Sequence, residues 1–557
     1  MQPTTKTNLK IYFFFLVITF AFYGITYKAG FTSDFMGWVQ DYDSYSFKEV
    51  INSAPYRFKS MYHFTHLLMY AMTYLFRMSG VPWFLVFSGL YALNAFFLFN
   101  IFNRLFQASR INNGFWITMI GVLFFMLSPY QPEVMVWRAS FHYLIGFAMM
   151  LGIIQLALKY YDTNQTKYFY AALGIFICSA FSIEYFLFTP AIVFLFLIFK
   201  DKLKEKKETE KTKLLYQFNL PAYRLPLMLC IVVAGYFVLH YFMFGRLFAH
   251  GRTGSSVNFI SLQGASTYGK YFFKELFFTR HLAHVDKEAF LKFFEITKVA
   301  VFIIALVIVI LISCLLYFEK FSVRAKFIFL NFLLYSLLLL PVLPVSFNWI
   351  QFSKNDRYGY FPSAFLFVGL SLALSYLPKK FFYTISCVYL LFSSYLLIKS
   401  NRIWMKSERV VSAVSYKFHN WDAKEVFVLS EPENYLGMDM FSEWSDTSGI
   451  VVAAEVYQKK KFAGNARGIL QYNMTTPTDG VNVKQIASDT LLVTFNQWGN
   501  WWWKKGLGAS NYETADYKVI LDLNNCGRCY ALVLKNKNPD RVYLYQDGDE
   551  LKEFKVK

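Results

Sequence analysis

Residues 297–317 read TKVAVFIIALVIVILISCLLY, a single lysine followed by nineteen residues without a charge. A helix needs roughly 20 apolar residues to cross about 30 Å of hydrocarbon. Ten other stretches have a comparable character: 11–29, 83–103, 115–128, 140–158, 168–183, 185–199, 222–243, 327–346, 361–377 and 381–398. The pattern predicts a polytopic α-helical membrane protein with about 11 transmembrane helices.

The composition of the 557 residues agrees with this class. Hydrophobic residues make up 56% of the chain and aromatic residues 21%. That balance is too apolar for an ordinary soluble protein, and it suits lipid contact and aromatic belts at the membrane surface. The Lys-, Asn- and Phe-rich composition favours a bacterial inner membrane.

The net charge of +20 is concentrated in short joints between the apolar stretches. The joints contain Arg104 and Arg110, Lys159 and Lys167, residues 200–213, Lys320, Arg324 and Lys326, and Lys379 and Lys380. With eleven spans and a cytoplasmic N-terminus, every one of these joints lies in the cytoplasm, as the positive-inside rule requires. The charge therefore indicates anionic headgroups as its partner rather than nucleic acid.

The chain divides into a membrane domain, residues 1–400, and a C-terminal domain, residues 401–557, on the extracytoplasmic, periplasmic side. The membrane domain has two long external loops, 30–82 and 244–296. Residues 59–80 interleave apolar and polar side chains, so they are expected to form an interfacial helix rather than a span. Alternating runs such as YKVILDL predict an α/β or β-rich fold for the C-terminal domain.

Cys526 and Cys529 separate two strand-like runs of this C-terminal domain. A disulfide at the tip of a hairpin suits an oxidising external compartment. Zinc binding or redox chemistry is the alternative, although one C-x-x-C without a second ligand pair is a weak signal.

Three carboxylates follow the first apolar stretch, in FTSDFMGWVQDYDSYSF at 31–47. Asp34 lies at the depth of the membrane surface, where polar residues tend to have a reason to be present. A carboxylate there could remove a proton from an acceptor hydroxyl as a general base. Asp41 and Asp43 are candidates for the same role, with helix capping as the structural alternative.

The next external segment reads SPYQPEVMVWRASFHYLIGF at 128–147 and contains Glu133, Arg138 and His142. Arg138 and His142 are four residues apart and share a face if this segment is helical. The alternative is an interfacial ion pair with a snorkelling arginine. Glu184 stands alone among Phe, Leu and Tyr, where an unpaired carboxylate is costly. It is therefore either a salt-bridge partner of Arg138 or Arg357, or an active-site acid.

The motif NDRYGYFPS at 355–363 ends an external loop and begins an apolar stretch. Arg357 offers a planar guanidinium suited to phosphate oxygens at the depth of a lipid headgroup. Asp356 precedes it, and Tyr358 follows as either a ligand-binding side chain or a belt aromatic. Two residues elsewhere are candidates for glycan contact. One is His281, in a basic loop that is expected to recognise a phosphate or a glycan; with His284 and Asp286 it also forms an H-x-x-H-x-D fragment, which alone is a weak metal signal. The other is Trp501 in NQWGNWWWKKG, where interface anchoring or core packing explains the tryptophans as well.

Taken together, these segments resemble the membrane part of GT-C glycosyltransferases, especially TMTC-type O-mannosyltransferases and their bacterial relatives. That family has an acidic first loop, an interfacial helix, an HP-x-x-x-E-x-V-x-W loop, a Lys-Glu pair and an E-R-Y-L-Y-L-P-S motif. The corresponding segments here are the loop with Asp34, the 59–80 helix, SPYQPEVMVW at 128–137, Ile183-Glu184 and DRYGYFPS at 356–363.

The resemblance implies an enzyme that moves a sugar from a polyprenyl-phosphate-linked donor to a glycan or protein acceptor, with inversion. Asp34, Asp41, Asp43 and Glu184 would be catalytic. Arg357, Arg138, His142 and Tyr358 would bind the donor phosphate, and Glu133, Asp356, His281 and Trp501 would contact acceptor or sugar. No metal ligands are assigned, but a divalent metal ion stays open because carboxylates serve both as bases and as ligands.

Three departures from the family pattern limit what it implies. The first loop lacks the adjacent acidic pair, which leaves the identity of the base open among the three aspartates. Ile183 replaces the lysine before the acidic residue, and residues 401–557 replace the helical repeats, so the acceptor is not implied. Two other functions remain as alternatives, namely a transporter or flippase for lipid-linked glycans and a non-catalytic scaffold for polysaccharide assembly.

Overall fold

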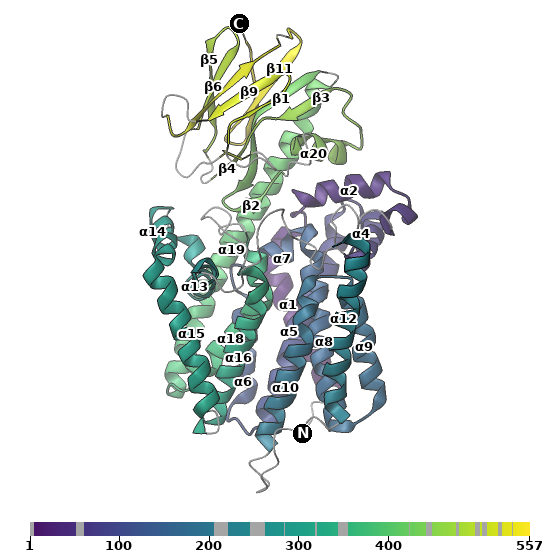
Figure 1. Ribbon diagram of the computed structural model, residues 1–557, viewed down its shortest axis with the longest axis vertical. Coiled ribbons are helices and arrows are strands. Elements are labelled where there is room, and N and C mark those ends of the chain that lie inside the picture. The colour runs from purple at the N-terminus through teal and green to yellow at the C-terminus, as the bar shows by residue number, and fades with distance from the viewer. Residues whose placement is uncertain are drawn as a thin grey trace.

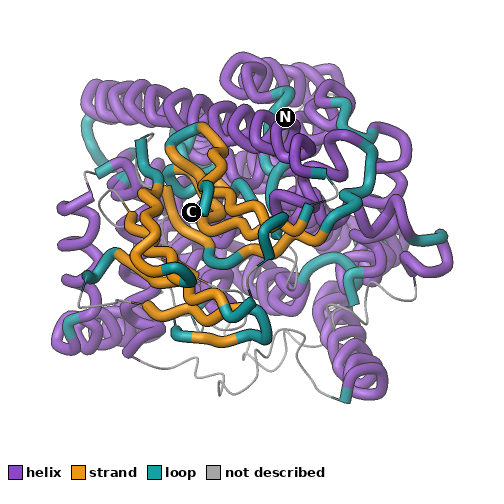
Figure 2. Tube along the Cα trace, turned by 90° about the horizontal axis from the view of Figure 1, so that it is seen from above, coloured by secondary structure: helices purple, strands orange, loops and turns teal. Residues whose placement is uncertain are grey.

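A computed structural model of the protein describes residues 5–51, 61–204, 221–245, 262–282, 284–317, 320–343, 355–422, 424–441, 448–474, 478–495, 502–503, 510–521, 526–536 and 538–556. The described residues form a bundle of helices with a β-rich region at one end (Figure 1). Seen along the bundle, the strands lie over the ends of the helices (Figure 2).

Each of the eleven predicted apolar stretches contains a helix. These helices are α1 (Thr5–Tyr23), α5 (Gly80–Ala108), α6 (Gly114–Met126), α8 (Phe141–Thr163), α9 (Thr166–Ala180), α10 (Thr189–Lys204), α12 (Arg224–Phe244), α15 (Thr297–Tyr317), α16 (Val323–Leu339), α18 (Tyr360–Leu374) and α19 (Lys379–Phe418). The hydrophobic pattern therefore located the helices of the bundle correctly.

Fewer of these helices are long enough to cross a bilayer by themselves. Among the described residues, six are long and apolar enough, namely those containing α1, α5, α8, α12, α16 and α19. A seventh is a pair bent by 69°, Ala289–Glu295 with Thr297–Ile310. The helices α6, α9, α10 and α18 have only 13–16 residues. The described part of the chain thus has six or seven candidate spans, and the count of eleven stays a prediction.

The outer faces of several bundle helices are apolar. Phe242 in α12 is 81% exposed, and α15 and α19 expose Phe302 and Leu391 in the same way. Large apolar side chains on the outside of a soluble protein would be costly, but they contact lipid tails favourably in a bilayer. The faces agree with the candidate spans in indicating an integral membrane protein.

The basic joints meet at one end of the bundle. Asp162 at the end of α8 pairs with Arg104 of α5 and Lys200 of α10. Arg324 at the start of α16 donates a hydrogen bond to the carbonyl of Ser375, just after α18, at 3.1 Å. The N-terminus lies at this end, and the C-terminus lies at the opposite end beyond the strands (Figure 1).

Short helices occupy the end of the bundle that faces the strands. They are α2 (Asp34–Ser44), α4 (His63–Phe76), α7 (Pro132–Val136), α13 (Leu262–Phe277) and α14 (His284–Glu295). The helix α4 falls within the predicted interfacial segment 59–80 and lies beside α2 in this layer (Figure 1).

The C-terminal region is a mixed β-structure that follows directly from α19. This helix continues through residue 400, where the composition changes, and ends only at Phe418. The strands are β1 (Glu425–Tyr435), β2 (Met438–Asp439), β3 (Asn465–Gly468), β4 (Gln471–Met474), β5 (Val481–Ala487), β6 (Thr490–Phe495), β7 (Trp502–Trp503), β8 (Tyr512–Glu513), β9 (Tyr517–Leu521), β10 (Cys529–Leu534), β11 (Arg541–Asp547) and β12 (Glu550–Phe554).

The strands form two sheets. One has the order β12-β11-β1-β4-β7, with β2 and β3 also paired to β1, and the other has the order β5-β6-β10-β9-β8. The central strand β1 is parallel to β3, β4 and β11 and is almost entirely buried. The helix α20 (Gly449–Gln458) packs against α19 and α2. A disulfide joins Cys526 and Cys529 in the turn between β9 and β10, as expected.

This arrangement predicts that opposite ends of the bundle face opposite compartments. Two exposed residues can each be replaced by cysteine as a reporter: Ser488 in the β5–β6 turn and Gln165 between α8 and α9. The two variants, Ser488→Cys and Gln165→Cys, are made in a background without reactive cysteines. A membrane-impermeant maleimide should label one of them in intact cells and the other only after permeabilisation. Labelling of both in intact cells would contradict the arrangement.

Candidate functional site

The predicted site residues fall mostly at the end of the bundle that faces the strands. Arg357 and Glu133 form the centre of this group. Glu133, which is 3% exposed, accepts a hydrogen bond from the backbone N–H of Arg357 at 3.1 Å and pairs with its guanidinium. It also accepts the backbone N–H of Asp356. One carboxylate therefore fixes both the backbone and the side chain of the motif at 355–363.

The side chain of Arg357 is not fully buried. Its guanidinium lies over the rings of Trp137 and Tyr358, with its carbon 5.0 Å and 4.8 Å from their centroids. Its side chain is 17% exposed, whereas that of Glu133 is 3% exposed. A guanidinium held by a carboxylate on one edge and by aromatic faces presents its remaining N–H groups in a fixed direction.

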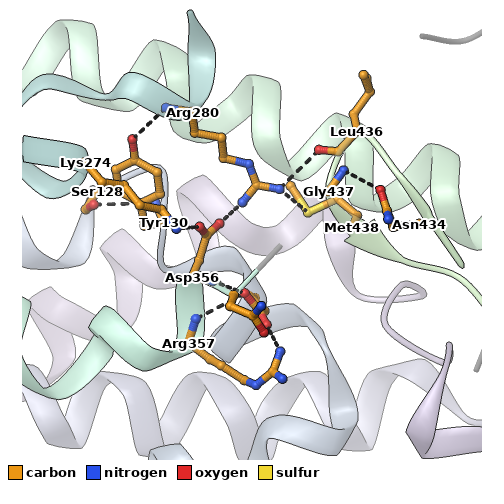
Figure 3. Close-up of polar contacts among 12 residues, drawn as sticks. Ser128, Tyr130, Lys274, Arg280, Asp356, Arg357, Asn434, Leu436, Gly437 and Met438 are labelled. Atoms are coloured by element: carbon orange, nitrogen blue, oxygen red, sulfur yellow. Dashed lines mark hydrogen bonds and ion pairs between the residues drawn. The ribbon is translucent and has the colours of Figure 1, made fainter. Parts of the chain in front are cut away.

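Asp356 points away from Arg357 and into a second ion cluster (Figure 3). It pairs with Lys274 at 2.6 Å and with Arg280, and all three side chains are at most 5% exposed. The ammonium of Lys274 lies 5.4 Å from the ring centroid of Tyr130, whose hydroxyl accepts the backbone N–H of Arg280 at 3.3 Å. Asp356 was predicted to contact acceptor or sugar, but its carboxylate is occupied by these two cations.

Glu275 is a buried acid next to this cluster that the sequence did not single out. It is 1% exposed, and within the described part of the chain neither carboxylate oxygen has a hydrogen-bond partner. Its Oε1 packs against the backbone of Gly359, where an added Cβ would come within 2.2 Å. Burial raises the pKa of Glu275 to about 8, although Lys274 opposes the shift. This carboxyl is therefore largely protonated at neutral pH.

Glu184 and His142 meet through an aromatic side chain. Glu184 begins the 3-10 segment Glu184–Phe188 and accepts a hydrogen bond from the hydroxyl of Tyr62. The ring of Tyr62 stacks on His142 with centroids 6.2 Å apart. The sequence predicts that Glu184 is either a salt-bridge partner of Arg138 or Arg357, or an active-site acid. In the structure Tyr62 is one of its partners, and Arg357 pairs with Glu133 instead.

The helix α2 brings two of its three aspartates to the same side as this group. Asp34, Trp38 and Asp41 are spaced four and three residues apart, so they share one face of the helix. The ring of Trp38 lies 6.4 Å from that of His142. Asp43 lies on the opposite face, where it is 3.7 Å from Arg77 and more than half exposed. The geometry therefore favours Asp34 and Asp41 over Asp43.

Aromatic side chains connect the Glu184 group with the Arg357 group. The ring of Tyr143 lies 4.6 Å from that of His142, 6.2 Å from Tyr185 and 6.5 Å from Tyr358. The hydroxyl of Tyr185 donates a hydrogen bond to the carbonyl of Tyr358 at 3.3 Å. The two groups are thus connected by packed aromatic side chains, and together they form the candidate site of acidic, basic and aromatic residues.

Three predicted residues lie outside this site. Arg138 is fully buried between the rings of Phe31 and Phe87, and it donates a long hydrogen bond of 3.5 Å to the carbonyl of Tyr27. His281 packs beside Tyr130, and burial together with Arg280 lowers its pKa to about 3. Trp501 falls outside the described residues.

In the ranges that the structure describes, no group of three or more His, Cys, Asp or Glu side chains is placed to hold a metal ion. Comparisons with known proteins add no assignment, because no family model, no curated protein and no solved structure matches the chain.

Replacement of Glu133 tests the pairing at the centre of the site. Glu133→Gln preserves shape but leaves Arg357 without its counter-charge, and breaking a buried pair costs about 3–5 kcal/mol. The thermal midpoint of the purified protein should fall by several degrees. Asp162→Asn weakens two partly exposed pairs at the other end, with Arg104 and Lys200, and should cost less than about 1 kcal/mol for each pair. Equal effects of the two variants would refute a buried pair at Glu133.

Replacement of Glu275 predicts a pH effect. Because the folded state raises the pKa from 4.5 to about 8, it binds the proton more tightly than the unfolded state. Stability therefore falls as pH rises between these values. Glu275→Gln removes this pH-dependent loss of stability. The free energy of unfolding of the variant should therefore rise relative to that of the wild type between pH 5 and pH 8, by about 1.4 kcal/mol per unit of pKa shift. Thermal unfolding of wild type and variant at pH 5 and at pH 8 measures this difference in stability, with Glu295→Gln as an exposed control. A stability difference that does not change with pH would contradict the raised pKa of Glu275.

Proposed function

We propose that the protein is an integral-membrane glycosyltransferase that uses a polyprenyl-phosphate-linked sugar as donor. The main support is the partly exposed side chain of Arg357, whose guanidinium is held by Glu133 beside a connected group of carboxylates and aromatic rings. A phosphate needs a fixed cation, an acceptor hydroxyl needs a base, and a sugar favours aromatic faces and carboxylates. All of these are present at one end of a membrane-embedded bundle.

The donor phosphate would bind at Arg357. Glu133 pairs with one terminal nitrogen of the guanidinium, and the remaining N–H groups would donate to phosphate oxygens. Tyr358 and His142 both contact the ring of Tyr143, which connects the Arg357 group with the Glu184 group. The apolar outer faces of the bundle supply an environment in which the polyprenyl chain can stay within the bilayer while its phosphate reaches the site.

The reaction would be a single displacement. The acceptor hydroxyl oxygen forms a bond to the anomeric carbon as the bond from that carbon to the phosphate oxygen breaks. The hydroxyl proton passes to Asp34 or Asp41, and the electron pair leaves on the polyprenyl phosphate, where Arg357 stabilises the developing charge. One displacement inverts the anomeric centre. Glu184 would orient the sugar by accepting hydrogen bonds from its hydroxyl groups.

In this proposal, the end of the bundle with the basic joints faces the cytoplasm of a bacterium. The site and the C-terminal region then lie on the periplasmic side. The acceptor, a glycan or a protein, would approach from that compartment.

Purified protein in lipid nanodiscs, supplied with synthetic polyprenyl-phosphate sugars and a candidate acceptor, tests the proposal through release of polyprenyl phosphate. Asp34→Asn or Asp41→Asn should lower kcat by about 10²–10⁴, the usual contribution of a general base. Asp43→Asn is the matched control, since Asp43 lies on the opposite face of α2, and it should retain activity. Arg357→Lys should raise KM and lower kcat, because lysine keeps the charge and loses the planar fork.

Activity that survives in each of the variants Asp34→Asn, Asp41→Asn and Asp43→Asn would remove α2 as the source of the base. Absence of release by the wild type, together with no thermal stabilisation by the donor lipids, would reject the enzyme and favour a transporter or a scaffold.

A further inference from the structure

The turn between β1 and β2 of the C-terminal region reaches into the site. This turn, residues 434–440, is called the docking hairpin below. Leu436 and Gly437 have positive φ angles of 51° and 83°. The N–H of Gly437 donates to the Asn434 side chain at 3.1 Å, and the N–H of Leu436 donates to the carbonyl of Met474 at 2.8 Å. The hairpin is therefore held in one conformation by its own region of the chain.

One side of the docking hairpin binds Arg280. A terminal nitrogen of Arg280 donates to the carbonyl of Leu436 at 3.2 Å and lies 3.3 Å from the sulfur of Met438 (Figure 3). The same guanidinium pairs with Asp356, the residue directly before Arg357. The side chain of Arg280 is 5% exposed, so its N–H groups need these partners in place of water.

The other side of the docking hairpin binds the start of α2. The carbonyl of Met440 accepts the backbone N–H of Ser33 at 2.8 Å, and Ser33 directly precedes Asp34. Ser33 has a φ of 55°, a left-handed conformation that a non-glycine residue keeps only when neighbouring contacts fix it. The helix α20 reinforces this contact, since Glu455 accepts a hydrogen bond from Gln40 of α2 at 2.6 Å.

Charge also connects the hairpin to the site. Asp439 is 6% exposed and lies close enough to Arg280 and Arg357 to interact electrostatically with both. Its backbone carbonyl accepts the hydroxyl of Ser407 in α19 at 3.2 Å. An acidic side chain of the C-terminal region is thus part of the charge balance around the proposed phosphate-binding arginine.

We infer that the docking hairpin is a positioning element of the site, which fixes the helix carrying Asp34 relative to the segment carrying Arg357. The C-terminal region is then a part of the site rather than a separate module attached to it. The positioning follows from the contacts above, and only its effect on turnover rests on the proposed glycosyltransferase function.

Hydrogen–deuterium exchange on the full-length protein in nanodiscs tests the positioning. Gly437→Val places a β-branched side chain at a positive φ and should distort the hairpin. Exchange of the amides at residues 33–36 and 356–357 should accelerate by about fivefold or more. Gly527→Val, also at a positive φ but with open space around the added Cβ, is the matched control and should leave these amides unchanged.

If Gly437→Val does not fold, Gly437→Ala carries the same test with a smaller strain. Unchanged exchange at residues 33–36 and 356–357, while the hairpin itself exchanges faster, would overturn the inference. Turnover is the second readout: Gly437→Val should lower kcat at least tenfold relative to Gly527→Val. A wild type without turnover would count against the proposed function alone, since the exchange result decides the positioning independently.

Discussion

The site depends on the fact that Asp356 and Arg357, adjacent in sequence and opposite in charge, bind partners on opposite sides. Arg357 pairs with Glu133 of α7, whereas Asp356 pairs with Lys274 and Arg280 from the α13 segment. Charges buried in this way are tolerated only when they are paired and hydrogen-bonded. Three ion pairs in two opposite directions therefore fix the motif at 355–363 to two distant segments and set the direction of the guanidinium.

Much of the fold could be predicted from local sequence, because hydropathy and alternation depend on nearby residues alone. The helices of the bundle, a helix within 59–80, the disulfide of Cys526 and Cys529 and the β-rich region all followed from such patterns. The lengths of the helices did not follow from these local patterns. An apolar run does not reveal where the chain turns into a 3-10 segment, as it does at Glu184–Phe188, so the number of candidate spans is smaller than the number of apolar stretches.

The candidate site was only partly accessible to the same reasoning. The types of residue and the end of the bundle at which they gather could be predicted, and the spacing of Asp34, Asp41 and Asp43 could in principle have separated Asp43. The choice of ion-pair partners could not be predicted from the sequence, because it depends on contacts between segments that are far apart in the chain. Lys274 and Arg280 appeared in the sequence as part of a basic loop, and their burial against Asp356 is a tertiary property. Asp439 carried no sequence signal at all.

The continuity of α19 constrains how the chain can vary. Its 40 residues form one helix of about 60 Å, of which roughly 20 residues suffice to cross the hydrocarbon. The remainder carries the sheets at a fixed height and a fixed rotation above the bundle. Insertion of one residue there would rotate the sheets by about 100° about the helix axis and take the hairpin away from Arg280 and Ser33. Substitutions in this segment can accumulate, but a change in its length is tolerated only if the rotation is restored.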